Sequence, residues 1–412
     1  MEYGLIGEHL GHSYSPEIHA KIGDYAYTLQ ELTPAEVGPF LEKRDFLGIN
    51  VTIPYKETVL PYLDDISPAA RLIGAVNTIV NRKGKLYGDN TDFFGMQELF
   101  RHGGINPQGK HALILGTGGT AKTAHAVLKS LGAKSIVHVS RQAQSGAVTY
   151  AEAPVLQKDA QIIVNTTPVG MYPAVEGCPL DLSLFPEVEG VVDAVYTPLR
   201  TNLVLDEQAK GILAEGGLYM LAAQAVAAAS LFQNQPLDQS RMETVYAQVW
   251  REKVNIVLLG MPSAGKTTVG KALAKLSGKP FIDTDQLIVE RLGCSIGEYF
   301  AQAGEEAFRQ VEAEVVAEAA KERGAVIATG GGVVLRPENL RALQRNGKTI
   351  FLDRPLEKLL PTPDRPLALN REALTQRYQE RYPLYCQAGE WHVPSVQEPK
   401  VVAETIWKEI AP

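Results

Sequence analysis

Apolar positions near the N-terminus follow two different periods. Residues 45–53 and 75–80 are short β-branched runs bounded by Gly, Asn and Pro, which is typical of strands, whereas residues 34–43 and 92–102 have the apolar spacing of helices. Strands that alternate with helices predict an open α/β layer. We therefore expect an α/β domain in this part of the chain.

A second series of elements begins near Lys110. The strand pattern HALILG is followed by a glycine turn, a helix over residues 121–131 and further strand patterns at SIVHVS, QIIVN and GVVDAV. A strand, a glycine turn and a helix in this order predict a βαβ unit with a parallel sheet.

A third series follows two consecutive helical patterns, GLYMLAAQAVAAASLF and residues 237–249. The apolar strand VNIVLLG comes directly after them, so we place a domain boundary near Trp250 to Val254. A linker of about five residues spans at most ~17 Å. We expect domains at 1–250 and 253–412, with 1–101 and 219–250 forming one part of the first domain and 102–218 the other.

Composition supports compact domains and excludes some classes of protein. The 412 residues exceed the roughly 250 to 300 at which one core stops growing, and 45% are hydrophobic and 21% charged. The part before Arg251 has 18 basic and 26 acidic residues and the rest has 22 and 21, so neither part has a basic field for nucleic acid.

Location is also constrained by composition. The three cysteines are scattered, which suits a reducing cytoplasm, and the first residues lack both the basic and the apolar region of a secretory signal. The most apolar stretch, residues 216–232, contains Gln224 and is too short to span a bilayer. We expect a cytoplasmic protein without a membrane partner.

The first candidate for chemistry is GTGGTAKT, Gly116 to Thr123, which opens the helix after HALIL. Glycines at such a turn let backbone amides at a helix N-terminus approach a pyrophosphate, so this position predicts a dinucleotide site. The next strand ends in Ser140-Arg141 without an acidic residue. An arginine there favours the 2′-phosphate of NADP, and an ordinary surface arginine is the alternative.

The second candidate is GMPSAGKT, Gly260 to Thr267, between the strand NIVLLG and the helix VGKALAKL. Loop amides in this eight-residue pattern cradle phosphates, while Lys266 reaches the β and γ groups and Thr267 binds magnesium. The pattern predicts a nucleoside triphosphate site but leaves the phosphate acceptor open.

Further motifs surround the first glycine loop. They are SYSP (13–16), NVTIPYK (50–56), GAVNT (74–78), GDNTD (88–92), NTTPVGM (165–171), DAVYTPLRT (193–201) and MLAAQA around Gln224. Together they resemble shikimate dehydrogenase over essentially residues 1–250. The resemblance implies that Lys56 and Asp92 are the catalytic pair and that Ser13 and Ser15 bind the substrate carboxylate.

The same resemblance implies two larger sets of residues. The substrate would be bound by Ser13, Ser15, Thr52, Lys56, Asn77, Asp92, Tyr196 and Gln224. NADP would be bound by Gly116, Gly118, Gly119, Thr120, Ala121, Ser140, Arg141, Thr166, Met171 and Gly217. Taken singly, Lys56 could be a solvated surface lysine and Asp92 a helix N-cap. The chain has Ser140-Arg141-Gln142 where the family commonly has Asn-Arg-Thr, and Thr117 and Thr120 replace the usual alanines.

Motifs after the second glycine loop resemble shikimate kinase from residue 253 to the end. They are FIDTD (281–285), GEEAFRQVE (304–312), ATGGGVV (328–334), DRPL (364–367) and RYQERYPLY (377–385). The resemblance implies a shikimate site formed by Asp285, Arg309, Gly330, Gly331, Gly332 and Arg381. Guanidinium forks suit a planar carboxylate. Taken singly, Arg309 could be an exposed helix residue paired with Glu305 or Glu306, and Arg381 an ordinary surface charge.

ATP and Mg²⁺ would occupy the loop of the second part. The predicted ATP residues are Pro262, Ser263, Ala264, Gly265, Lys266, Thr267, Thr268 and Arg365. The predicted catalytic residues of this part are Lys266, Arg365 and Asp285, the last of which belongs to the acceptor site. Because VIATGGG ends in glycines where many such enzymes have an aspartate, we expect Asp283 to hold magnesium through water, beside Thr267. Arg365 would belong to a lid, whose preceding residues lack a basic run for stacking on adenine.

The leading hypothesis is an enzyme with two α/β parts: an N-terminal α/β substrate domain with a Rossmann NADP domain, then a P-loop kinase domain with a central parallel sheet. It would reduce 3-dehydroshikimate with NADPH and phosphorylate shikimate with ATP. The alternatives are a dehydrogenase that prefers quinate, a kinase for another polyol such as gluconate, or a second part that only senses ATP. Oligomeric state is left open.

Overall fold

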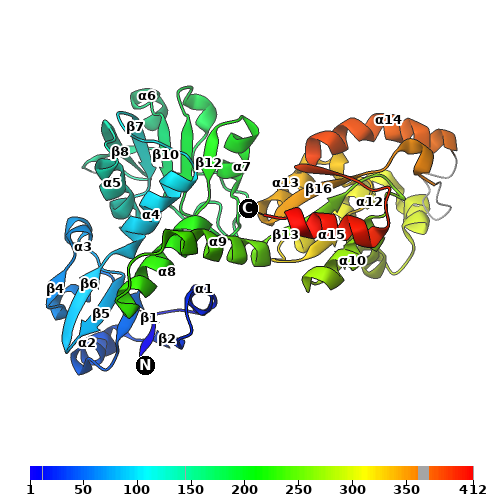
Figure 1. Ribbon diagram of the computed structural model, residues 1–412. Helices are drawn as coiled ribbons and strands as arrows, with labels where there is room; N and C mark the ends of the chain where they lie inside the picture. Colours follow the sequence, from blue (N-terminus) through cyan, green and yellow to red (C-terminus); the bar gives the residue numbers. More distant parts are fainter. Residues whose placement is uncertain (12, 144, 361–370, 412) are drawn as a thin grey trace. The chain divides into compact units, whose positions relative to one another are not determined.

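The structure is a computed structural model that describes residues 1–412 except 12, 144, 361–370 and 412 (Figure 1). The chain divides into two compact units, Met1–Val249 and Trp250–Pro412. Each unit has its own hydrophobic core.

The first sheet of the first unit is mixed. Its described strands are β1 (Tyr3–Gly7), β2 (Tyr27–Glu31), β3 (Gly48–Val51), β4 (Asp65–Ile66), β5 (Thr78–Arg82) and β6 (Lys85–Asp89), in the order β2-β1-β3-β5-β6-β4. The helices α1 (Ser15–Ile22), α2 (Pro34–Lys43) and α3 (Pro68–Ile73) accompany them. β5 and β6 form a hairpin because Lys83 and Gly84 both take positive φ angles, 53° and 84°. The helix expected at 34–43 is confirmed as α2. The strands expected at 45–53 and 75–80 are present with other bounds, as β3 and β5.

Two long helices connect this sheet to the second one. α4 (Thr91–His102) leads out of the first sheet, and α8 (Leu218–Gln233) returns to it. They pack closely, because a Cβ atom on Gly95 of α4 would lie 2.7 Å from the carbonyl oxygen of Met220. Gly95, the glycine in FFGMQELF, therefore permits the close contact between α4 and α8, the two helices that link the sheets.

The second sheet is parallel throughout its described strands, β7 (His111–Leu115), β8 (Ser135–Ser140), β9 (Ala147–Thr149), β10 (Ile162–Asn165), β11 (Gly190–Asp193) and β12 (Leu213–Glu215). Its helices are α5 (Gly119–Ser130), α6 (Ala153–Leu156) and α7 (Asn202–Ala209). The order β12-β11-β10-β7-β8-β9 places the first strand, β7, in the middle. This is the Rossmann order, and in such sheets ligands bind beyond the carboxyl ends of the strands where the order reverses, here between β7 and β10.

The boundary between the units lies within a helix. α9 (Gln239–Lys253) continues through the segment expected to be a linker, so that expectation was wrong for Trp250 to Lys253. Two contacts explain the extra turn: Lys279 Nζ donates to the carbonyl oxygens of Glu252 and Val254 at 3.0 Å each, and the Arg251 guanidinium lies 3.9 Å from the ring centre of Trp407. Neither partner is near in sequence.

The second unit is built on one parallel sheet. Its described strands, β13 (Asn255–Leu259), β14 (Phe281–Asp283), β15 (Val326–Ala328), β16 (Gly347–Asp353) and β17 (Trp391–Pro394), have the order β14-β15-β13-β16-β17. The helices are α10 (Lys266–Ser277), α11 (Thr284–Leu292), α12 (Ile296–Ala319), α13 (Pro337–Asn346), α14 (Arg371–Ala388) and α15 (Pro399–Glu409). Every residue of the central strand β13 is buried, as its continuous apolar run predicts.

Candidate functional sites

The eight predicted dehydrogenase substrate residues surround one cavity of the first unit. The cavity has a volume of about 360 Å³ and is walled by the β1–α1 loop, β3 and the segment after it, α4, α8 and Tyr196. Its lining includes Ser13, Ser15, Thr52, Lys56, Asn77, Asp92, Tyr196 and Gln224. The structure therefore brings together residues that are far apart in the chain.

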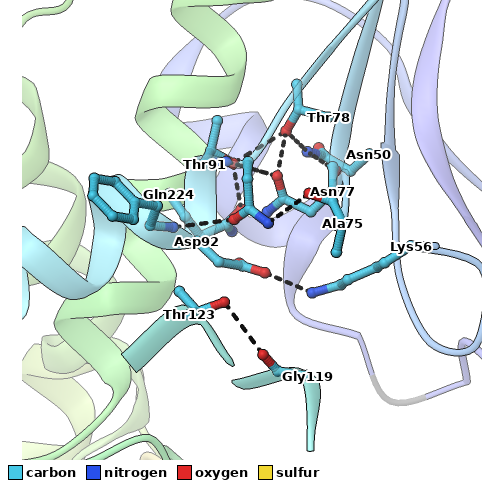
Figure 2. A network of polar contacts seen from close by, with 12 residues as sticks. Asn50, Lys56, Ala75, Asn77, Thr78, Thr91, Asp92, Gly119, Thr123 and Gln224 are labelled. Carbon is cyan, nitrogen blue, oxygen red and sulfur yellow. Dashed lines mark hydrogen bonds and ion pairs between the residues drawn. The ribbon is translucent and has the colours of Figure 1, made fainter. Parts of the chain in front are cut away.

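Lys56 and Asp92 form an ion pair in this cavity (Figure 2). The Lys56 Nζ atom lies 2.5 Å from Oδ2 of Asp92, and the two side chains are 30% and 19% exposed. Asp92 stands in the first turn of α4, whereas Lys56 comes from the segment after β3. The pair leaves the ammonium oriented by a carboxylate and still accessible to a substrate.

Next to this pair, a largely buried network of polar contacts holds the amide side chains in place (Figure 2). Asn77 Oδ1 accepts the backbone N–H of Thr91 at 2.7 Å. Asn50 Nδ2 donates to Thr78 Oγ1 at 3.0 Å, and the Thr91 hydroxyl lies 3.5 Å from Gln224 Oε1. The sequence prediction omitted Asn50, Thr78 and Thr91, although each belongs to one of the motifs NVTIPYK, GAVNT and GDNTD.

Ser13 and Ser15 lie together where α1 begins. Their hydroxyl oxygens are 3.1 Å apart, and the Ser15 N–H donates to Ser13 Oγ at 3.3 Å. Two hydroxyls beside the N-terminus of a helix suit an anionic group such as a carboxylate.

The first glycine loop joins β7 to α5 as predicted. Gly116 has a φ of 109°, and a Cβ atom there would lie 2.9 Å from Thr166 Oγ1. At Gly118 and Gly119 a Cβ atom would meet nothing within 4 Å, so the backbone at the N-terminus of α5 is open to a ligand. These features fit a pyrophosphate, and Thr120 and Ala121 lie in the following turn of α5.

The remaining predicted NADP residues lie at strand ends or in loops. Thr166 follows β10 and donates to the carbonyl oxygen of Leu115 at 2.7 Å. Ser140 is the last residue of β8, and Arg141 after it is exposed, as is Met171. A Cβ atom on Gly217 would lie 2.3 Å from the carbonyl oxygen of Ala194, so only glycine fits there.

The second glycine loop lies between β13 and α10. Gly260, Ser263 and Gly265 have positive φ angles, 152°, 64° and 95°, which curl the loop backbone. Lys266 is buried, and its Nζ atom donates to the carbonyl oxygens of Gly260 at 2.7 Å and Met261 at 3.0 Å. The loop from Pro262 to Thr268 has the curled backbone and the lysine that fit a triphosphate.

The predicted magnesium residues are neighbours. Thr267 Oγ1 donates to Asp283 Oδ2 at 2.8 Å. Asp283 Oδ1 in turn accepts the N–H groups of Asp285 and Gln286, at 3.1 and 3.4 Å, and caps α11. A hydroxyl and a carboxylate fit Mg²⁺, which takes few protein oxygens and completes its shell with water and phosphate.

The predicted acceptor residues converge on the glycines after β15. A Cβ atom on Gly330 would lie 2.6 Å from Asp285 Oδ1, and one on Gly332 would lie 1.8 Å from Arg309 Nη1. Arg381 Nη1 donates to the carbonyl oxygen of Gly331 at 2.8 Å. A Cβ atom on Gly331 would touch Pro262 at 3.1 Å, so the acceptor residues border the triphosphate loop.

Two residues of this site were missed by the sequence prediction. Glu312 is buried and accepts from Arg309 Nη1 at 2.7 Å, and Tyr385 donates to the carbonyl oxygen of Gly331 at 2.6 Å. Burial raises the pKa of Glu312, and the Arg309 charge opposes that rise.

The structure also decides the alternatives for the two arginines. Arg309 and Arg381 are only 6% and 7% exposed, so the interpretation of either as a surface charge is wrong, although the expected contact of Arg309 with Glu305 exists. Arg365 and the motif DRPL lie outside the described residues.

The two sites define the class of protein: a dinucleotide-dependent dehydrogenase followed by a P-loop kinase of small molecules. The family model for the shikimate dehydrogenase substrate binding domain matches residues 5–79, and the model for shikimate kinase matches residues 262–411. A shikimate dehydrogenase (NADP(+)) of Clostridium beijerinckii is 36% identical over 262 residues, covering 60% of this chain and 96% of the relative.

Solved structures agree with this likeness. A chorismate mutase/shikimate 5-dehydrogenase fusion protein from Clostridium acetobutylicum matches with a TM-score of 0.57 and 33% identity over 59% of this chain and 94% of that chain. Shikimate 5-dehydrogenase of Thermus thermophilus, solved with NADP(H) and shikimate, matches with a TM-score of 0.54 and 33% identity over 60% of this chain and 98% of that chain.

The chain belongs to the shikimate dehydrogenase family and carries a shikimate kinase domain after it. It is an enzyme of the shikimate pathway with an NADP-dependent and an ATP-dependent part, and its partners are small molecules related to shikimate. The predicted family, fold class and cofactors are confirmed. None of the described helices combines the length and the apolar composition that crossing a membrane requires.

Proposed function

We propose that the first unit reduces 3-dehydroshikimate to shikimate with NADPH and that the second transfers phosphate from ATP to the 3-hydroxyl of shikimate. The observation that supports this proposal is that the predicted dehydrogenase substrate residues line one cavity, and that the predicted kinase acceptor residues lie against the glycines after β15, in a chain whose two families share one compound. The product of the first reaction would be the substrate of the second.

In the reduction, Lys56 and Asp92 would act on the oxygen of the ring ketone. NADPH supplies the hydride, and negative charge develops on that oxygen. The Lys56 ammonium can stabilise this charge and donate a proton, while Asp92, 2.5 Å away, orients Lys56. Ser13 and Ser15 would hold the substrate carboxylate. The ring hydroxyls would be held by Thr52, Asn77, Asp92 and Gln224, and Tyr196 would also bind the substrate.

In the phosphorylation, the chain's residues would position and neutralise charge. Lys266 would leave its two loop carbonyls for the β- and γ-phosphates, and Thr267 with Asp283, through water, would hold Mg²⁺. Arg309 and Arg381 would bind the shikimate carboxylate and Asp285 its hydroxyls. Arg365 would approach the transferring phosphoryl group from the lid.

We further propose a division of the first unit into 1–101 with 219–250 for the substrate and 102–218 for NADP, with the kinase at 253–412. The chain passes from the first sheet to the second through α4 and returns to the first through α8, which supports this division. We also propose a cytoplasmic enzyme that binds neither nucleic acid nor membrane, supported by the acidic charge of −7 and the scattered cysteines.

A coupled assay tests the proposed function. The purified protein, given 3-dehydroshikimate, NADPH and ATP with Mg²⁺, should oxidise NADPH and form shikimate 3-phosphate. Failure to oxidise NADPH would contradict the first activity, and shikimate accumulating without its phosphate would contradict the second. Turnover of quinate above that of shikimate would favour the quinate alternative, and ATP effects on reduction without phosphate transfer would favour the sensing alternative.

A further inference from the structure

Arg309, which the proposed function assigns to the shikimate carboxylate, is closed off on one side. Its Nη1 atom donates to the buried carboxylate of Glu312 at 2.7 Å. A Cβ atom on Gly332 would lie 1.8 Å from Nη1 and 2.8 Å from Nη2, so the end of the guanidinium between these two atoms packs against the glycine. A ligand must therefore approach Arg309 along the opposite edge, formed by Nε and Nη2.

In the structure, the Nε/Nη2 edge of Arg309 is occupied by the carboxylate of Glu305. Glu305 Oε1 accepts from Arg309 Nε at 3.3 Å and from Nη2 at 3.0 Å. The Glu305 side chain is 53% exposed and that of Arg309 only 7% exposed, so Glu305 stands between Arg309 and water. A carboxylate on the Nε/Nη2 edge is the arrangement that a bound substrate carboxylate would make with this arginine.

The backbone before Glu305 is shaped for this position. Gly304 interrupts α12 with φ 83° and ψ 174°, a conformation that essentially only glycine adopts. The helix restarts at Glu305, which places its side chain one turn before Arg309 and in contact with it. Arg377 also lies within electrostatic reach of Glu305, which gives a displaced carboxylate a second cation.

We propose that Glu305 is an internal substitute for the substrate carboxylate: it occupies the Nε/Nη2 edge of Arg309 in the empty site, and shikimate must displace it to bind. The inference rests on the proposed kinase function. Glu305 would thereby determine specificity, because only a ligand that brings its own carboxylate can replace the ion pair that is lost. Shikimate binding forms an ion pair with Arg309 but breaks the one between Arg309 and Glu305, so the net gain in binding free energy is only the difference between the two. Glu305 therefore raises the KM for shikimate.

Steady-state kinetics of ADP formation, with shikimate as the varied substrate and no NADP(H) present, tests this on the full chain. Glu305→Gln should lower the KM for shikimate by about two- to fivefold, the size expected for losing a half-exposed ion pair, with little change in kcat. Glu306→Gln is the matched control: the neighbouring carboxylate is 88% exposed, contacts Arg336 instead, and should leave KM unchanged.

A second variant separates contact from long-range charge. Glu305→Asp keeps the charge but is one methylene too short to reach Arg309, so it should lower KM as the Gln variant does. Three outcomes would overturn the inference. The KM for shikimate could be unchanged or raised in Glu305→Gln, Glu305→Asp could behave like the wild type, or Glu306→Gln could lower the KM as much as Glu305→Gln does. If the wild-type protein forms no ADP with shikimate, the proposed function fails and the inference with it.

Discussion

Among individual residues, Lys56 is the one on which the reduction depends most directly. We predict that Lys56→Met lowers kcat for reduction by roughly 10²- to 10⁴-fold, because the charge developing on the ketone oxygen loses its proton donor. The KM for NADPH should change little, since Lys56 lines the substrate cavity. NADPH oxidation measures both constants.

The control is Lys85→Met, an exposed lysine of β6 that should retain wild-type rates. A Lys56→Met enzyme with nearly normal kcat would show that another group donates the proton.

A second residue, Asp193, should give the first unit a distinct pH dependence. Burial raises the pKa of Asp193 to about 6, against hydrogen bonds from Thr201, Val195 and Asn165 that act in the opposite direction. The native state then holds this proton more tightly than the unfolded chain. The stability that Asp193 contributes is therefore complete below its unfolded pKa and is lost as the pH rises through about 6.

We predict that Asp193→Asn removes this loss. Between about pH 4 and about pH 7, the free energy of unfolding of the wild type should fall by roughly 2 to 3 kcal/mol relative to the variant. Urea titrations across this range, following the transition that NADP⁺ stabilises, measure the difference. A difference between the two proteins that does not vary with pH would show that Asp193 stays ionised.

At the scale of elements, the glycine run after β15 depends on close packing. A Cβ atom on Gly332 would lie 1.8 Å from Arg309 Nη1, and Glu312 holds that same atom at 2.7 Å. We predict that Gly332→Ala displaces the guanidinium and raises the KM for shikimate by about 10- to 100-fold, the value of a charge-assisted hydrogen bond. The KM for ATP and the rate of ketone reduction serve as internal controls, and a uniform loss of all three would indicate misfolding instead.

These elements also mark how much of the fold could be predicted from the sequence. The strand patterns, both glycine loops and the helix at 34–43 were predictable because each depends on local periodicity and turn chemistry. The continuation of α9 through Trp250 was not, since it rests on Lys279 and Trp407, which are distant in sequence.

Side-chain partners were harder to predict than motifs. Glu312 stands three residues from Arg309 on a helix, as does Glu306 on the other side, and spacing alone cannot say which is buried. The fold decides it by bringing Gly332 against Arg309. The residue sets for both substrates are now placed in space, and the role of each residue stays a prediction.

At the scale of the whole molecule, two compact units each contain a complete set of described candidate residues, apart from the predicted lid. Each unit has its own core and its own parallel sheet, and the described residues that line the cavity of the first unit all precede the boundary. The two reactions should therefore be separable, even though they share an intermediate.

Because the two reactions should be separable, we make a prediction about two full-length variants that each lack one activity. Lys56→Met should lose reduction and keep phosphorylation of added shikimate, whereas Lys266→Met should lose phosphorylation and keep reduction, because each lysine belongs to one site. Mixed together, the two variants should convert 3-dehydroshikimate to shikimate 3-phosphate after a lag in which free shikimate accumulates. The wild-type protein should show the same lag at equal site concentrations, and labelled shikimate added in excess should dilute fully into the product. A wild-type protein that forms shikimate 3-phosphate without this lag, or whose product is not diluted by the labelled shikimate, would instead mean that shikimate passes between the sites of one chain without entering solution.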